Sequence, residues 1–328
     1  MSDVETPTPP KSFTAPKASA AAELISIVTA PTRPIFSIVV LTYARDEVVQ
    51  RLLVELAAHL GERCDYELFL VDNNVDAVDR GAWLKPFSHA AWLRIGFNKG
   101  CVARNDGMAA ARGDYIILID DDCFVQTSDF LDQFAQAFGQ DPRIGAVTTR
   151  KLLEETMDIR RDLIPHTRKD IDLLKPFLTF RIVGGVMAFR RTMFDQLGGF
   201  SADFFYGLEE IEYAYRIVDA GWKILYTPAI ISIELEHQGG RRPASEVTTI
   251  RLANKYIISF MHMPFPQIFF NFIVFTPYTF LFYRGQTNIL GAISTFLRWL
   301  ARRDRPRRKP IGPEARAYIR SCGGVIWR

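Results

Sequence analysis

The 328-residue sequence has few cysteines and histidines, and it lacks two common nucleotide-binding signatures. Its four cysteines form no CxxC pair and have no histidine at zinc spacing, so neither a zinc site nor a disulfide framework is expected. This cysteine usage is typical of a reducing compartment. No GxGxxG motif follows the first hydrophobic segment, which continues as TYARDE, and this excludes a Rossmann-type dehydrogenase. A P-loop is also absent.

The net charge of +3 is unevenly distributed along the chain. Residues 284–328 contain eleven Arg or Lys and two acidic residues, a balance of +9, so the rest of the chain carries +3 − 9, or −6. A basic tail on an acidic body indicates an anionic partner, either a lipid surface or a nucleic acid. Nucleic acid is not expected, because the tail has no recognisable nucleic-acid fold and no aromatic stacking surface among its charges.

Hydrophobic runs alternate with helical patterns in the first part of the chain. Continuous apolar runs predict buried strands, whereas apolar residues three and four apart predict helices. The predicted strands are 36–42, 66–72, 92–95, 115–119, 144–148 and 181–190. The predicted helices are 47–60, 102–111 and 128–138, with another that begins at Glu209. The alternation predicts an α/β fold in which helices flank a mostly parallel central sheet.

Two of the predicted strands end in carboxylates. Asp72 ends one strand, and the triplet Asp120, Asp121 and Asp122 directly follows another. Because ligands of open α/β sheets bind outside the carboxyl ends of the strands, we expect these side chains at one functional edge. Adjacent carboxylates raise one another's pKa unless a cation neutralises them. The triplet therefore predicts either a cation site or a turn that is exposed to water.

A second acidic cluster and a glycine pair follow later in the chain. Glu209 and Glu210 begin a predicted helix, where acidic residues are common because they complement the helix dipole. This pattern alone does not distinguish a helix start from a catalytic carboxylate. Gly184 and Gly185 interrupt a predicted strand, which indicates a bulge or the close approach of a ligand or of another backbone segment.

Seven segments between residue 36 and about residue 240 together resemble family 2 of the inverting nucleotide-sugar glycosyltransferases. Each segment is common by itself, but here all seven occur in the family's order. They are VVLTYAR (39–45), VDNN (71–74), GFNKGCVARNDG (96–107), IDDDC (119–123), GGF (198–200), GLEEIEYAYR (207–216) and HQGG (237–240). The resemblance implies the GT-A fold, and within the family it is similar to bacterial rhamnosyltransferase-like enzymes of cell-surface polysaccharide synthesis.

The resemblance also implies a donor site with a divalent metal. It assigns the metal, Mn²⁺ or Mg²⁺, to Asp122, Asp120 and His237; such hard cations prefer carboxylate oxygens and offset the charge of a departing diphosphate. It implies that Asp72 contacts the nucleobase, which favours a UDP- or dTDP-sugar because a carboxylate accepts a hydrogen bond from the imide N–H. The residues implied to bind the nucleotide-sugar are Thr42, Arg45, Asp72, Asn98, Gly100, Arg104, Asp120 and Asp121.

On the acceptor side, the resemblance places Glu210, or its neighbour Glu209, where the family has a general base that is usually Asp. Such a base deprotonates the acceptor hydroxyl, and a single displacement then inverts the anomeric carbon. Gly184 and Gly185 are implied to line the acceptor side. The expected acceptor is a saccharide or a polyprenyl-diphosphate-linked saccharide. Two alternatives stay open: a catalytically silent GT-A-fold scaffold at a membrane, and a sugar nucleotidyltransferase.

The chain is expected to divide into a disordered leader (1–34), a GT-A domain (35–245) and a helical C-terminal extension (246–328). The leader lacks the charged start and apolar core of a signal peptide. Residues 263–283 carry no charge and include seven Phe, but three prolines interrupt them, which favours a segment in the interface of an anionic bilayer over a spanning helix. A subunit interface is the open alternative, so an oligomer is not excluded. The expected location is the cytoplasmic face of the plasma membrane.

Overall fold

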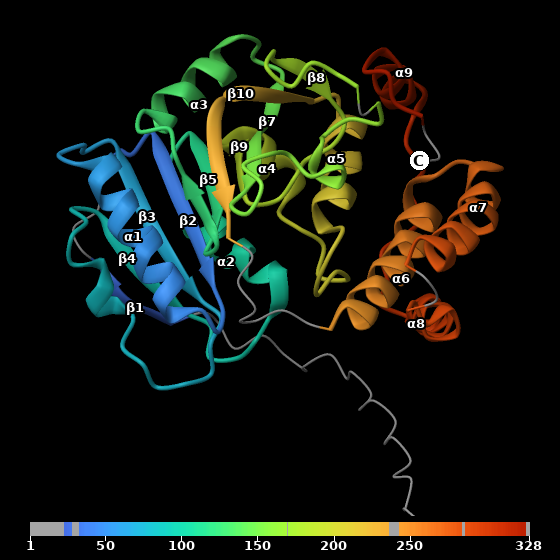
Figure 1. The fold of residues 1–328 in the computed structure, drawn as a ribbon, viewed down its shortest axis with the longest axis horizontal. Coiled ribbons are helices and arrows are strands. Elements are labelled where there is room, and N and C mark those ends of the chain that lie inside the picture. Colours follow the sequence, from blue (N-terminus) through green and yellow to red (C-terminus); the bar gives the residue numbers. More distant parts are fainter. Residues whose placement is uncertain (1–22, 28–32, 169, 236–242, 284–285, 326–328) are drawn as a thin grey trace, which may run out of the picture.

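The computed structural model describes residues 23–27, 33–168, 170–235, 243–283 and 286–325. Its centre is one curled sheet with helices on both faces, and a group of C-terminal helices lies at one side of the sheet (Figure 1). The strands are β1 (Glu23–Ile27), β2 (Phe36–Thr42), β3 (Tyr66–Asp72), β4 (Ala90–Arg94), β5 (Tyr115–Asp120), β6 (Cys123–Val125), β7 (Ile144–Leu153), β8 (Phe177–Thr179), β9 (Val186–Arg190) and β10 (Lys223–Glu234).

The helices are α1 (Asp46–Leu60), α2 (Arg104–Ala110), α3 (Phe130–Gly139), α4 (Arg191–Leu197), α5 (Glu209–Asp219), α6 (Ala244–His262), α7 (Gln267–Phe282), α8 (Ile289–Ala301) and α9 (Pro313–Ser321). Short 3₁₀ helices occupy Gly81–Leu84, Gly100–Ala103 and Arg161–Leu163. The predicted α/β fold is confirmed, and most predicted elements lie within a few residues of their observed bounds.

The sheet order is β1-β4-β3-β2-β5-β9-β7-β10-β6, and β8 pairs with β10. Strands β4, β3, β2 and β5 are parallel, and their register pairs Thr42 with Asp72 and Leu41 with Asp120. The carboxyl ends of β3 and β5 therefore meet at one edge of the sheet, as the sequence predicted.

The sheet is mixed rather than mostly parallel, which corrects one part of the sequence-based prediction. Strand β9 lies antiparallel between β5 and β7, and β1, β6 and β8 are antiparallel to their partners. Alternation of strands and helices does not fix the direction in which a strand enters the sheet. Within the leader of residues 1–34, which is predicted to be disordered, the described segment Glu23–Ile27 pairs with β4. Residues 1–22 and 28–32 lie outside the described residues.

The core strands bury side chains on both faces, which explains their continuous apolar runs. On β2, Ile38 packs on the face covered by α1 and α3, whereas Val39 packs on the face covered by α2, α4 and α5. On β5, Ile117 and Leu118 divide in the same way.

The C-terminal helices share a hydrophobic core with the sheet. Ile258 of α6, Phe296 of α8 and Ile319 of α9 belong to the same buried cluster as the α5 residue Tyr213. Helix α6 contacts both α7 and α8, and Figure 1 shows these three helices grouped beyond α5. Among the described residues, no helix combines the length and the apolar character needed to cross a membrane.

Candidate functional site

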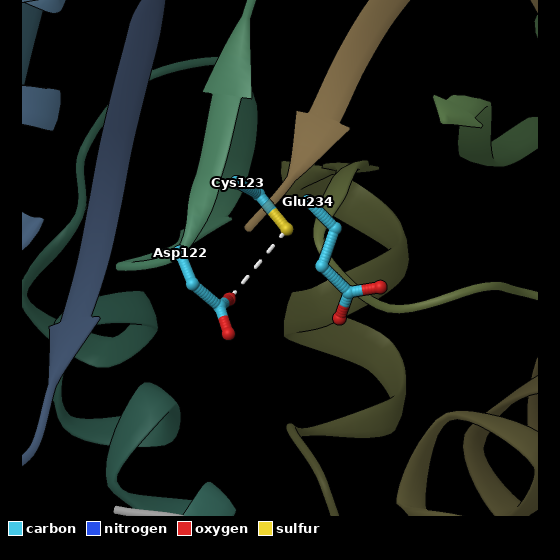
Figure 2. Close-up of side chains that lie close together, drawn as sticks. All are labelled: Asp122, Cys123 and Glu234. Carbon is cyan, nitrogen blue, oxygen red and sulfur yellow. Dashed lines mark hydrogen bonds between the residues drawn. The ribbon is translucent and has the colours of Figure 1, made fainter. Parts of the chain in front are cut away.

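Strands β5, β6 and β10 bring two carboxylates and a thiol together. Cys123 begins β6 and pairs with Glu234 at the end of β10, and the backbone N–H of Leu235 donates a 2.8 Å hydrogen bond to the carbonyl of Asp122. Ligand atoms of Asp122, Cys123 and Glu234 all lie within 4.8 Å of one another. Figure 2 shows the Cys123 side chain between the two carboxylates. Its sulfur lies 3.7 Å from Asp122 Oδ1.

The chemistry of this group fits a divalent cation held by oxygen. Burial raises the pKa of Asp122 to about 6 against the opposing charge of Arg45, and nearby carboxylates including Glu234 add repulsion. A cation between Asp122 and Glu234 would relieve both effects. Burial also raises the pKa of the Cys123 thiol well above its usual value, so it stays protonated. Since Mn²⁺ and Mg²⁺ prefer oxygen ligands, the two carboxylates are the better donors.

Two basic side chains balance this acidic edge. Nη1 of Arg45 lies 2.7 Å from Asp121 Oδ1 and 2.7 Å from Asp122 Oδ2, so the first loop after β2 is tied to the Asp triplet. Lys151 of β7 is almost fully buried, and its Nζ lies 3.2 Å from Glu234 Oε2. Lys151 therefore lies in the sheet and helps to neutralise the site.

Arg104 connects the Asp triplet to the second acidic cluster. Its Nη2 lies 2.5 Å from Asp120 Oδ1, and its Nη1 lies 3.2 Å from Glu209 Oε1. The Arg104 and Glu209 side chains are buried, and the guanidinium is the shared counter-charge of both carboxylates. Asp120 therefore faces Arg104 and is not part of the group formed by Asp122, Cys123 and Glu234. Its metal role stays a prediction, and His237 lies outside the described residues.

Glu210 lies beside the predicted acceptor-side glycines. A β-carbon on Gly184 would collide with Oε1 of Glu210, so the absence of a side chain at residue 184 leaves the space that this carboxylate fills. Burial and the neighbouring charge of Glu209 raise the pKa of Glu210 to about 7, against the opposing effect of Arg104. Gly185 has a φ of +113°, and a β-carbon there would meet Lys151 and Cys123. Both glycines precede β9 rather than lying within it.

Asp72 is buried, and its oxygens already have partners within the protein. Oδ1 accepts hydrogen bonds from the backbone and side-chain nitrogens of Asn74, and Oδ2 accepts one from Trp92 Nε1 at 3.1 Å. Arg80 Nη1 lies 3.3 Å from Oδ2, and the same buried guanidinium also pairs with Asp46 and Asp76. Sequence reasoning missed Arg80, which has no motif of its own. The predicted base contact of Asp72 is not tested by this arrangement.

The remaining predicted donor residues lie around the same edge. Thr42 is fully buried at the end of β2, and its hydroxyl has no hydrogen-bond partner in the described part of the chain. Asn98 Oδ1 accepts hydrogen bonds from Asn73 Nδ2 and from the backbone N–H of Gly100. A β-carbon on Gly100 would overlap the carbonyl of Phe205, so this glycine allows two loops to pack closely. The N–H of Gly100 already donates to Asn98 within the protein.

Comparison with known proteins gives two overlapping matches to family models. Residues 37–198 match the model of glycosyl transferase family 2, and residues 173–238 match that of the N-terminal domain of galactosyltransferase. Residues 37–198 are therefore a glycosyl transferase family 2 domain. A relative in this comparison, the uncharacterized glycosyltransferase YwdF of Bacillus subtilis (strain 168), is 29% identical over 180 residues. That alignment covers 51% of this chain and 62% of YwdF, which is less than two thirds of the relative.

Solved structures confirm the GT-A fold of this chain. GalNAc-T7 in complex with UDP, GalNAc and Mn²⁺ superposes with a TM-score of 0.59 at 16% identity, covering 76% of this chain and 51% of that chain. The mannosyltransferase PcManGT of Pyrobaculum calidifontis, in complex with GDP-Man and Mn²⁺, gives a TM-score of 0.55 at 18% identity. That match covers 90% of this chain and 81% of PcManGT.

Glu234 is the candidate ligand that the motifs did not reveal. It lies three residues before His237, in the same ELEH segment, and it reaches Asp122 only because β10 and β6 pair in antiparallel register. The sequence did contain a sign of this ligand, because Glu234 is a carboxylate at the end of a strand. Only the strand order shows that the end of β10 lies next to Asp122.

Proposed function

We propose that this protein is an inverting glycosyltransferase that transfers a sugar from a UDP- or dTDP-sugar to a saccharide or lipid-linked saccharide during cell-surface polysaccharide synthesis. The observation that carries the proposal is the Arg104 bridge between Asp120 and Glu209. It places the first turn of α5, with Glu210, beside the strand ends that carry Asp122 and Glu234. The carboxylates that we assign to the donor and to the acceptor thereby lie at one edge of the sheet.

Glu210 is the proposed general base. Its Oε accepts the proton of the acceptor hydroxyl while that oxygen forms a bond to the anomeric carbon. The bond from this carbon to the diphosphate breaks on the opposite side, so the sugar inverts and a nucleoside diphosphate leaves. A pKa of about 7 suits this role, because a base is most effective when its pKa lies near the working pH.

The donor diphosphate is proposed to lie beside Asp122 and Glu234, which would hold Mn²⁺ or Mg²⁺. Such a metal, when bound, offsets the charge that develops on the leaving diphosphate. Lys151 and Arg45 limit the repulsion among the carboxylates of this edge. The neighbours GalNAc-T7 and PcManGT are both complexes with Mn²⁺, which supports this cofactor. One holds UDP and the other GDP-Man, so the preference for UDP or dTDP rests on the resemblance at Asp72.

The proposal is tested by calorimetric titration of UDP, dTDP and GDP, each with Mn²⁺ or with EDTA. The wild-type protein is compared with Asp122→Ala and with the control Glu155→Gln, whose carboxylate is exposed. Metal-dependent binding of UDP or dTDP, lost in Asp122→Ala and kept in the control, is the expected result. If no nucleotide binds, the transferase proposal fails and the silent scaffold becomes the better reading.

Product analysis with two sets of substrates separates the two enzyme classes. A glycosyltransferase releases a nucleoside diphosphate from a nucleotide-sugar and an acceptor. A sugar nucleotidyltransferase instead joins a nucleoside triphosphate to a sugar 1-phosphate and releases inorganic diphosphate. We expect UDP or dTDP as the released product, and inorganic diphosphate would overturn the assignment.

A further inference from the structure

Helix α7 has several polar side chains on its protected side and many apolar side chains on its exposed side. Asn271 and Thr279 are buried, and Thr276 Oγ1 lies 2.7 Å from the hydroxyl of Tyr256 on α6. Ile273 and Leu281, by contrast, are 72% and 74% exposed. A surface helix of a protein in water normally shows the reverse arrangement. The outer face of α7 is therefore suited to an apolar medium.

Exposed apolar side chains lie on α8 as well as on α7. The ring centres of Phe272 on α7 and Phe296 on α8 lie 5.4 Å apart, so the two helices contact each other. Leu290 and Leu297 of α8 are exposed, as are Phe269 and Phe282 of α7. We call these exposed side chains, with Ile273 and Leu281, the α7–α8 face. A large apolar surface of this kind is unusual on a monomer and marks an interaction site.

Cationic side chains border the α7–α8 face. The Arg308 guanidinium lies 5.1 Å from the ring centre of Phe265, which precedes α7. Arg298 is exposed on α8 beside Leu297, and Arg303 and Arg307 are exposed in the segment that follows. Residues 284–328 together carry the excess of nine positive charges.

We propose that the α7–α8 face docks on an anionic lipid bilayer, with its aromatic and aliphatic side chains in the interface and its arginines against the headgroups. Aromatic and aliphatic side chains on one face with Lys and Arg at its border are the features that such binding uses. A symmetric contact between two copies of this chain fits less well, because it would bring the arginines of one copy toward those of the other. Charge complementarity thus selects the lipid surface.

The docking face is connected to the catalytic helix through α6. Asn254 Nδ2 donates hydrogen bonds to the carbonyls of Tyr206 and Gly207, at 3.0 and 2.7 Å, just before Glu209. His262 Nε2 at the other end of α6 lies 3.1 Å from Glu212 Oε1 on α5. If the proposed function holds, docking would fix Glu210 at a set position relative to a lipid-borne acceptor.

Vesicle flotation of the full chain tests the docking without any donor or acceptor, so its failure is distinct from failure of the transferase proposal. The vesicles are phosphatidylcholine alone, or phosphatidylcholine with an equal part of phosphatidylglycerol. The variants are Ile273→Gln/Leu281→Gln and, as a control, Val54→Gln, which replaces an equally exposed apolar side chain on α1. All substituted residues are exposed, and circular dichroism checks that each variant folds.

We expect binding to the anionic vesicles, a loss of at least about tenfold in Ile273→Gln/Leu281→Gln, and no change in Val54→Gln. Arg303→Gln/Arg307→Gln should lose about 25-fold, because each cation near an anionic surface contributes about fivefold. Wild-type protein that binds neither vesicle overturns the inference. A second outcome also overturns the inference. It is a dimer in sedimentation analysis that becomes a monomer in Ile273→Gln/Leu281→Gln while vesicle binding is unchanged. The face would then join two copies of the chain.

Discussion

Gly184 and Glu210 lie so close that the carboxylate of the glutamate occupies the space a side chain on residue 184 would need. We predict that Gly184→Ala lowers kcat about 100-fold, because a displacement of about 1 Å at a catalytic group can cost that much. The free energy of unfolding should change little, since the end of a flexible side chain can move aside. Steady-state kinetics and urea unfolding measure the two effects.

A matched control for this substitution is Gly139→Ala, at the end of α3, where a β-carbon meets no atom within 4 Å. We expect wild-type kcat and stability for it. Wild-type kcat in Gly184→Ala would show that the observed position of Glu210 is not needed for transfer.

The pH dependence of transfer should follow the ionisation of Glu210. Its pKa is raised to about 7 by burial and by Glu209, and only the deprotonated form accepts a proton. The rate should therefore rise as pH increases through about 7 and level off above it. Glu209→Gln removes a negative neighbour, so the rising limb should move to lower pH. A limb that is unchanged in Glu209→Gln would assign the ionisation to another group.

Removal of the Arg104 side-chain charge should destabilise the fold. Arg104→Met leaves Asp120 and the buried Glu209 without their shared counter-charge, and breaking a buried pair on one side costs about 3–5 kcal/mol. Arg63→Gln is the control, because Arg63 pairs with Asp132 at the surface and such pairs contribute about 0–1 kcal/mol. Urea unfolding gives both values. Equal losses of unfolding free energy in the two variants would mean that the ion pairs of Arg104 contribute no more than a surface ion pair.

Metal affinity should depend on Glu234 more than on Asp120. Even side chains that only orient metal ligands contribute about 10–100-fold to affinity, so Glu234→Gln should weaken Mn²⁺ binding by at least that much. Asp120→Asn should have a smaller effect, because Asp120 faces Arg104. Calorimetry with Mn²⁺ and UDP measures both. The opposite order would restore Asp120 as the ligand, as the family resemblance implies.

Much of the fold was predictable because short local sequence patterns indicate its strands and helices. The strands 36–42, 66–72 and 115–119 are continuous apolar runs, and the observed β2, β3 and β5 share or nearly share these bounds. The direction of β9 was not predictable, because an isolated apolar run does not indicate which neighbours it will have. Strand β1 was missed since residues 1–34 have the composition of a disordered segment.

The candidate site also has features that were predictable from the sequence and features that were not. The sequence alone determined that carboxylates end strands β3 and β5 and begin α5, since strand ends and helix starts are local properties. Only the tertiary structure decided their partners: Asp72 is paired with Arg80, Asp120 with Arg104, and Asp122 with Glu234 as the candidate metal group. The physical reason is that ion pairs and metal ligands depend on distances of a few ångströms between segments far apart in the chain. Strand order and register set these distances, and no local motif encodes them.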